Sequence, residues 1–390
     1  MTTICPPELC TACGACMQSC MRQAIRMYKG DNGFIYPVIE KTKCTDCGLC
    51  RKNCPAAQPE TTTDSRPLSV FLAWNRNTPT RLRSSSGGLF SVIAEWTIRQ
   101  GGVVYGAAYD EQMNVIHTSA ENLIELEKLQ GSKYVQSNIG DTLKACRKQL
   151  EQDRYVYFTG TPCQIAGLKS FLHKKYEKLI TSDLVCHGVP SNELFQQQIH
   201  ALENKHHYSI MDFRFRAKNR FGQGYDLQVV TKQGKRYNYN ADLMPYFYGF
   251  WKNITLRESC YNCRYATTSR ESDITLADFW LAKKVFPGVK TSKGLSLILL
   301  NTETGINIWN SIKEYVEYKE TTLEQGAIGQ GHLKAPVHRP EASHGFLQEY
   351  SNGMPFDKIC RKFLTPSLKY TLKCRAKNII KILIGFKYWK

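Results

Sequence analysis

Two matching runs of cysteine constrain this chain more than any other feature of its sequence. Each run has the spacing C-x2-C-x2-C-x3-C; the first is Cys10, Cys13, Cys16 and Cys20, and the second is Cys44, Cys47, Cys50 and Cys54. Three cysteines at this spacing wrap one face of an iron–sulfur cubane, and the fourth reaches across to a second cubane. The repeat therefore predicts two 4Fe-4S clusters in a ferredoxin-like module.

Crossed ligation divides these cysteines into two sets. The first set is Cys10, Cys13, Cys16 and Cys54, and the second set is Cys20, Cys44, Cys47 and Cys50. Structural zinc is the alternative, but a zinc ribbon needs only two C-x2-C pairs, so two complete sets favour clusters. Met21 follows Cys20 where ferredoxins usually carry proline, a departure that bears on solvent access or potential and leaves the ligand in place.

The sequence between and after these runs divides the chain into parts. Strands at 25–28 and 34–36 around Asp31-Asn32-Gly33 predict a hairpin, and from residue 68 strands and helices alternate, which is typical of an α/β domain. We expect strands at 69–74, 103–109, 155–158, 179–185, 212–216, 225–230, 235–239 and 295–300, and helices at 89–100, 143–152, 165–175, 192–204 and 306–315. The predicted organisation is an α+β ferredoxin-like module at 1–58, a linker at 59–67, an α/β domain at 68–345 and a basic C-terminal tail at 346–390.

A third cysteine set is expected in the α/β domain. Cys163 and Cys186 each follow a predicted strand, and the carboxyl edge of such a sheet is where ligand sites form. Cys260 and Cys263 add a C-x2-C pair, which completes four thiolates for a third cluster. Two alternatives stay open: small buried hydrophobic side chains, and Cys163 as a nucleophile with His187 or His173 as its base. Cys5, Cys146, Cys360 and Cys374 lack such spacing and are not expected to be ligands.

Charge and cysteine content bear on partners and location. The formal net charge is +18, and three clusters at about −2 each would leave roughly +12. This surplus favours an acidic redox carrier protein, a phosphate-bearing cofactor or a membrane surface, whereas no nucleic-acid partner is expected without a nucleic-acid-binding motif. With 16 cysteines, no signal run and no apolar stretch near the length of a membrane span, we expect a cytoplasmic, metal-binding protein.

The end of the chain has a character of its own. From Lys369 to Lys390 it carries seven basic residues and no acid, interleaved with apolar and aromatic residues such as Ile379, Leu383 and Trp389. This pattern predicts an amphipathic helix in peripheral contact with the inner face of the membrane. A helix packed on the protein's own core and a disordered basic end are the alternatives.

Six segments of the chain carry a resemblance to a known family. They are Ser84-Ser85-Ser86-Gly87-Gly88, Gly131-Ser132-Lys133-Tyr134, Gly160-Thr161-Pro162-Cys163-Gln164, Cys186-His187-Gly188-Val189-Pro190, Cys260 with Cys263, and Arg270 through Asp273-Ile274 to Asp278-Phe279-Trp280. Together these segments resemble the beta-subunit family of the coenzyme F420 (deazaflavin) hydrogenases and dehydrogenases. The resemblance runs from about residue 68 to about residue 345, with the ferredoxin module in front.

The resemblance implies an α/β flavin- and cluster-binding domain in which FAD lies beside a 4Fe-4S cluster. Family cysteines that match Cys163, Cys186, Cys260 and Cys263 hold that cluster. Cys186 is followed by His187-Gly188, as in bacterial relatives that do not require the deazaflavin coenzyme, and members of this type are often associated with surface-polysaccharide synthesis. The substrate is therefore left open, and no catalytic residue is assigned.

One segment also has a physical interpretation of its own. Ser86, Gly87 and Gly88 open a predicted helix, and backbone N–H groups at a helix start can hold a pyrophosphate. Lys133 would add a positive charge there. A simple helix cap followed by a turn is the alternative for the glycines, and a solvated side chain is the alternative for the lysine. The sequence thus predicts an iron–sulfur flavoprotein oxidoreductase, with a non-catalytic electron-transfer subunit that lacks flavin as the rival.

Overall fold

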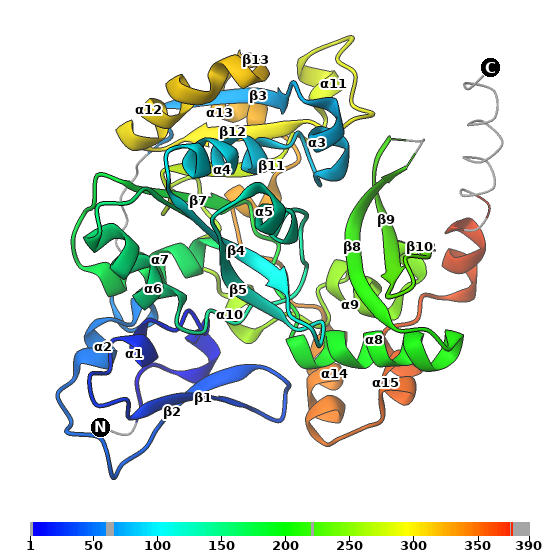
Figure 1. Cartoon of the computed structure of the whole chain (residues 1–390). Coiled ribbons are helices and arrows are strands. Elements are labelled where there is room, and N and C mark those ends of the chain that lie inside the picture. The colour runs from blue at the N-terminus through cyan, green and yellow to red at the C-terminus, as the bar shows by residue number, and fades with distance from the viewer. Residues whose placement is uncertain (1–2, 60–65, 220–221, 375, 377–390) are drawn as a thin grey trace.

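The computed structural model describes residues 3–59, 66–219, 222–374 and 376 (Figure 1). In the N-terminal module two short helices and an antiparallel hairpin surround the cysteine runs. The elements are α1 (Ala15–Gln18), β1 (Ile25–Lys29), β2 (Ile35–Ile39) and α2 (Leu49–Lys52), with 3-10 turns at Pro7–Leu9 and Pro55–Ala57. The hairpin predicted between the two runs is confirmed.

The two cysteine runs fold in the same way. Ala12 and Asp46 occupy matching places in the runs and both have a φ of 52°, while Gly14 and Gly48, which precede α1 and α2, have φ values of 76° and 74°. A residue other than glycine adopts this left-handed conformation at a cost of roughly 1–2 kcal/mol. Strain repeated at matching places points to a functional demand on the loops.

The larger part of the chain is built on a mixed eight-stranded sheet in the order β13-β3-β12-β11-β7-β6-β4-β5. The central strands β4, β6, β7 and β11 are parallel to one another, and the remaining pairs are antiparallel. The strands are β3 (Ser69–Asn75), β4 (Val103–Tyr109), β5 (Val115–Ala120), β6 (Val156–Thr159), β7 (Leu179–Leu184), β11 (Ile274–Asp278), β12 (Ser296–Leu300) and β13 (Val316–Thr321).

Helices cover both faces of this sheet. Val104 and Tyr157 pack with α4, α5 and α12, whereas their strand neighbours Val103 and Val156 pack with α6 and α7, as strand alternation requires. The N-terminal module lies below α6 and α7 (Figure 1). The helices are α3 (Thr78–Arg83), α4 (Leu89–Arg99), α5 (Leu123–Leu129), α6 (Thr142–Glu151), α7 (Pro162–Leu172), α10 (Glu258–Tyr261), α11 (Ala282–Val285), α12 (Glu303–Ile312) and α13 (Leu323–Gly326), with 3-10 turns at Lys313–Tyr315 and Gly331–Leu333.

A second group of elements stands beside the large sheet, around an aromatic core (Figure 1). Its antiparallel sheet has the order β10-β9-β8. Phe195, Phe215 and Phe250 are among the buried side chains that hold it together. The elements are α8 (Asn192–His206), β8 (Ile210–Asn219), β9 (Gly222–Thr231), β10 (Arg236–Asn240), α9 (Pro245–Trp251), α14 (Glu341–Ser351) and α15 (Phe356–Phe363), with a 3-10 turn at Ala241–Leu243.

Two departures from the predicted boundaries bear on the site and on the packing of the chain. α7 begins at Pro162, earlier than predicted, so Cys163 lies in the first turn of a helix. The packed part of the chain also extends past the predicted boundary at residue 345, because Phe346, Ile359 and Leu364 are buried in the aromatic core. The membrane-contact prediction for the tail falls mostly on 377–390, outside the described residues. Among the described helices, none is long and apolar enough to cross a membrane.

Candidate functional site

The first cysteine set is gathered inside the N-terminal module. Its members are buried and line one small cavity; they are Cys10, Cys13, Cys16 and Cys54. Burial raises the pKa of the Cys16 thiol, and the other three thiols of the set raise it further. Cys54, which belongs to the second run in sequence, therefore lies with three cysteines of the first run, the arrangement that crossed ligation requires.

The second cysteine set lies at the surface of the same module. Cys47 is exposed, and Cys20, Cys44 and Cys50 are half-buried. Burial raises the pKa of the Cys50 thiol, and the nearby Cys20 and Cys44 thiols raise it further. The structure thus brings the crossing cysteine of the first run, Cys20, to cysteines of the second run.

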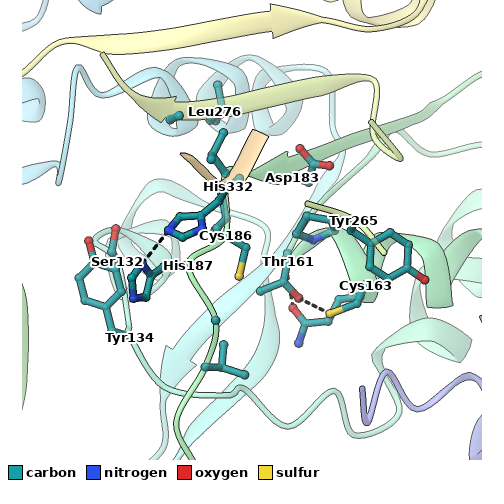
Figure 2. Close-up of a pocket in the computed structure, with 18 of the residues that line it drawn as sticks. Ser132, Tyr134, Thr161, Cys163, Asp183, Cys186, His187, Tyr265, Leu276 and His332 are labelled. Atoms are coloured by element: carbon teal, nitrogen blue, oxygen red, sulfur yellow. Dashed lines mark hydrogen bonds between the residues drawn. The ribbon is translucent and has the colours of Figure 1, made fainter. Parts of the chain in front are cut away.

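The third cysteine set gathers where central strands of the large sheet end. Cys163 follows β6, and Cys186 follows its parallel neighbour β7. Cys260 lies on α10, and Cys263 follows shortly after it. Burial raises the pKa of the Cys186 thiol, with further contributions from Cys260 and Cys263. These four cysteines line one cavity, and Figure 2 shows Cys163 and Cys186 in its wall.

The first and third sets are neighbours across α7. Cys163 and Gly167 lie one turn apart on the same face of this helix. A methyl group added at Gly167 would lie 2.6 Å from Cys13 Cβ, so the helix packs directly against the first set. Burial raises the pKa of the Tyr265 hydroxyl, and the Cys163 and Cys13 thiols raise it further, which places this ring close to both sets.

The remaining cysteines have other surroundings. Cys146 and Cys360 are buried among hydrophobic side chains, and Cys374 is buried with its Sγ 3.8 Å from an Asp242 carboxylate oxygen. Cys5 differs, because its hydrogen bonds to Cys10 and Cys54 lower the pKa of both thiols. Within the described ranges, no three His, Cys, Asp or Glu side chains converge closely enough to hold a single metal ion.

A cavity of about 730 Å³ connects the third set with the serine–glycine segment before α4. Its wall includes Ser84, Ser85, Ser86 and Gly88 together with all four cysteines of the third set. Gly88 has a φ of 87° and precedes the first residue of α4, so N–H groups of that helix start are at the cavity. The volume falls within the roughly 300–1,000 Å³ typical of cofactor sites, so this cavity fits a bound cofactor.

Two of the residues predicted to contact flavin have structural partners. Gly87 does not line the cavity: its N–H donates to Ser296 Oγ at 2.9 Å, and a Cβ there would meet the Ala73 carbonyl oxygen at 2.5 Å. Lys133 does line it, but Nζ donates to the carbonyl oxygens of Lys128 and Gln130, each at 2.9 Å. Burial lowers the pKa of Lys133 to about 8.

Comparison with known proteins gives the family. Residues 153–325 match the family model for the C terminus of the coenzyme F420 hydrogenase/dehydrogenase beta subunit, and residues 9–57 match a 4Fe-4S dicluster domain. The chain thus carries a domain that matches the F420 hydrogenase beta-subunit family at 153–325 and a ferredoxin module at 9–57. The family and module predicted from the sequence are confirmed. As such, the chain is an iron–sulfur protein of the oxidoreductase type that transfers electrons.

Other comparisons are more distant. The chain is similar in structure to a protein of the F420-reducing nickel–iron hydrogenase complex from Methanosarcina barkeri, with 14% identity and a TM-score of 0.46. That similarity covers 77% of this chain and 94% of the other. No curated protein matches the sequence.

The histidine that follows Cys186 in this beta-subunit-like chain does not serve Cys163. His187 Nδ1 lies 2.8 Å from His332 Nε2, and Figure 2 shows this pair on the other side of Cys186 from Cys163. Cys163 Sγ instead lies 3.1 Å from Thr161 Oγ1, and burial raises its pKa, which disfavours a reactive thiolate. His173 follows the far end of α7. Neither histidine predicted as a base is placed to activate Cys163.

Arg257 is the functional residue that the sequence interpretation missed. It is 1% exposed, and its guanidinium donates to Cys10 O at 2.6 Å, Gln136 Oε1 at 2.9 Å and Ile35 O at 3.0 Å. It also lies 4.5 Å from the Tyr36 ring centroid. Its own carbonyl accepts from the Cys260 N–H at 2.9 Å. One buried cation thus joins the ferredoxin module to the backbone of the third set, and no local motif marks it.

Two buried ion pairs fix the cavity end of the sheet. Arg216 binds both carboxylate oxygens of Asp278, at 2.7 and 3.2 Å. Arg270 Nη2 lies 3.1 Å from Asp183 Oδ2, with both side chains almost fully buried. Asp183 and Asp278 both line the cavity. The Arg270-to-Trp280 segment that carried the family resemblance therefore acts at least partly by positioning the strands around the site.

Proposed function

We propose that this chain is an iron–sulfur flavoprotein oxidoreductase that holds three 4Fe-4S clusters and FAD. The observation that carries the proposal is one cavity whose wall contains the four cysteines of the third set and the start of α4. Thiolates suit iron–sulfur clusters, and a glycine-led helix start suits a pyrophosphate. The third cluster and the FAD pyrophosphate would therefore lie in the same cavity.

The ligands divide into the three sets of cysteines. The first set would hold one cluster inside the module, the second set would hold one at its surface, and the third set would hold one at the cavity. Such clusters supply one-electron transfer, and a flavin supplies an exchange between one-electron and two-electron chemistry. The chain's own contribution is to bind these groups, order them in space and keep water from the buried first set.

The order of the sets supports this assignment. The exposed second set and the buried first set share the module, and the first set touches α7, whose first turn carries Cys163. The three sets therefore lead from the protein surface to the cavity. A surface-polysaccharide context stays a prediction from the family resemblance, and the use of the deazaflavin coenzyme stays open.

Cofactor analysis tests the proposal against its rival. Anaerobically reconstituted protein should contain about twelve irons, from three four-iron clusters, and one extractable FAD per chain. Replacing Cys260 by Ala should remove about four irons and leave the module's clusters in place. Iron without flavin would favour the non-catalytic electron-transfer subunit, and about eight irons in the unmodified protein would remove the third cluster.

A glycine substitution locates the flavin. In Gly88→Val the new side chain would crowd the start of α4, since a Cβ there lies 3.2 Å from Asn75 Cβ and Ser84 Oγ. FAD affinity should fall about tenfold or more, about 1.4 kcal/mol, as measured by flavin titration at equal iron content. Gly101→Val is the matched control, because Gly101 follows the other end of α4 with a similar left-handed φ and nothing within 4 Å. Equal FAD affinity in both variants would place the flavin elsewhere.

A further inference from the structure

The second cysteine set lies on a surface to which the proposed function gives no role. All cysteines of the first set are buried, whereas Cys47 of the second set is exposed and its three companions are half-buried. In Figure 1 the loop from β2 to α2, which carries Cys44 and Cys47, runs along the outer edge of the module. A cluster held there would be the one that another protein can approach most closely.

Basic residues flank the cysteines of this set in the sequence. Five of them are exposed: Arg22, Lys41, Lys43, Arg51 and Lys52. The two cysteine runs meet here, since Asn53 Nδ2 donates to Ser19 Oγ at 2.6 Å and the Cys20 and Cys50 thiols are close neighbours.

Most of these cations have no carboxylate partner of their own. Lys43 pairs with Glu40 at 2.8 Å, and Asp46 is the acidic residue inside the run. In the part of the chain that the structure describes, no carboxylate pairs with Arg22, Lys41, Arg51 or Lys52. Their charge is therefore available to a partner.

An exposed apolar side chain accompanies these basic residues. Met21 follows Cys20 directly and is 90% exposed, the most exposed of the large hydrophobic residues in the described chain. Interfaces enrich methionine at their apolar centre and place charge at the rim. The departure from the proline usual at this position therefore puts a flexible apolar contact beside a ligand of the surface cluster.

We propose that this surface docks a small acidic one-electron carrier protein of the ferredoxin or flavodoxin kind. The inference rests on the proposed function, because it assumes a cluster in the second set. An acidic carrier complements these exposed basic residues, is steered by a chain whose net charge stays at roughly +12 with three clusters bound, and covers Met21 on contact. Each productive encounter with a reduced carrier moves one electron: the carrier is oxidised and the chain is reduced.

Charge reversal tests the docking surface with a matched control. The test variant is Arg51→Glu with Lys52→Glu, and the control is Lys283→Glu with Lys284→Glu, an exposed pair on α11 at the opposite end of the molecule (Figure 1). The probe is a purified acidic 4Fe-4S ferredoxin in its oxidised form, whose affinity is measured anaerobically by titration calorimetry. At low salt the test variant should bind about tenfold more weakly than the unmodified chain, and the control within about twofold.

Salt and a small apolar substitution separate the two parts of the contact. At about 1 M salt, where screening reaches about 3 Å, the test variant and the unmodified chain should bind equally weakly. Met21→Ala should weaken binding a few-fold at every salt concentration, since it removes apolar contact and no charge.

Several outcomes would overturn the proposal. These are no binding to the unmodified chain, equal weakening by both charge-reversed pairs, or a change in self-association of the Arg51→Glu/Lys52→Glu variant without a change in carrier affinity. Reduction by methyl viologen, which needs no docking surface, reports separately on the chain itself. A chain that takes up no electrons from reduced methyl viologen lacks its clusters and contradicts the proposed function, whereas a chain that the viologen reduces normally but that binds no carrier contradicts only the docking surface.

Discussion

The two cluster sites of the N-terminal module share a sequence pattern and a backbone conformation but differ in surroundings. The first set is buried between the module and α7, with Arg257 bound to the carbonyl of Cys10. The second set faces solvent through Cys47. Identical spacing thus specifies which side chains can bind, while the elements packed around them decide how much water reaches the site.

We propose that this contrast gives the two sites different uses. A buried set that touches two domains is placed to connect them, and its ligands contribute to stability as well as to binding. An exposed set is placed to meet another molecule, at the expense of protection from chelators and oxygen. Variants that act on one set and spare the other can break this comparison.

The largest effect is expected from removing a ligand. Cys54→Ala and Cys47→Ala both alter the second run, yet crossed ligation assigns Cys54 to the buried site and Cys47 to the exposed one. Each variant should lose about four irons. The module cluster that remains should yield its iron quickly to a chelator in Cys54→Ala and slowly in Cys47→Ala. Uncrossed ligation would remove the same cluster in both variants, and their chelation rates would then agree.

The same comparison shows what sequence reasoning can reach. Strands β3, β4, β6, β7 and β12 were predicted because each is a short apolar run, and Cys163 and Cys186 could be placed at one sheet edge from their positions after two such runs. β13 was missed because it is an edge strand with mostly exposed, polar residues, and its sequence carries no apolar run. Periodicity predicts elements that bury one face, and exposed edges give little signal.

Long-range contacts lie beyond that reach. The hydrogen bond from Arg257 to Ile35 joins residues 222 positions apart, and the sequence around Arg257 contains nothing that distinguishes it from a surface arginine. Lys133 illustrates a second limit: its place in a family segment predicted a phosphate contact, and only the structure shows that its ammonium also binds carbonyl oxygens at the end of α5. Burial and partners of single charged residues depend on the whole fold.

A smaller effect is expected at the contact between the domains. Arg257→Met keeps most of the side-chain volume but leaves the carbonyl oxygens of Cys10 and Ile35 without this donor. The free energy of unfolding should fall by on the order of 3 kcal/mol. Hydrogen bonds from a charged group contribute about 1.5–3 kcal/mol each, and the losses of neighbouring bonds are not additive. Hydrogen–deuterium exchange should rise around the first set and change little around Cys47.

Arg99→Met serves as the control for that experiment, because Arg99 lies at the end of α4 with an exposed side chain. Arg257→Lys should give an intermediate result, since it keeps the charge but has fewer donors in a fixed geometry. Exchange that rises equally at both cysteine sets would show that the module responds as one unit and would remove the contrast between them.

The smallest effect is expected from one methyl group at the buried site. Gly167→Ala gains about 1 kcal/mol of helix propensity, but its Cβ would lie 2.6 Å from Cys13 Cβ. Overpacking costs about 1–3 kcal/mol, so the variant should be less stable by up to about 2 kcal/mol. Of the two clusters in the module, only the one held by the first set should show an altered electron paramagnetic resonance spectrum. Gly331→Ala is the control, because nothing lies within 4 Å of the position that an added Cβ would take at Gly331. A more stable Gly167→Ala with unchanged spectra would mean that α7 does not press on the first set, and the buried site would then owe its protection to the module itself.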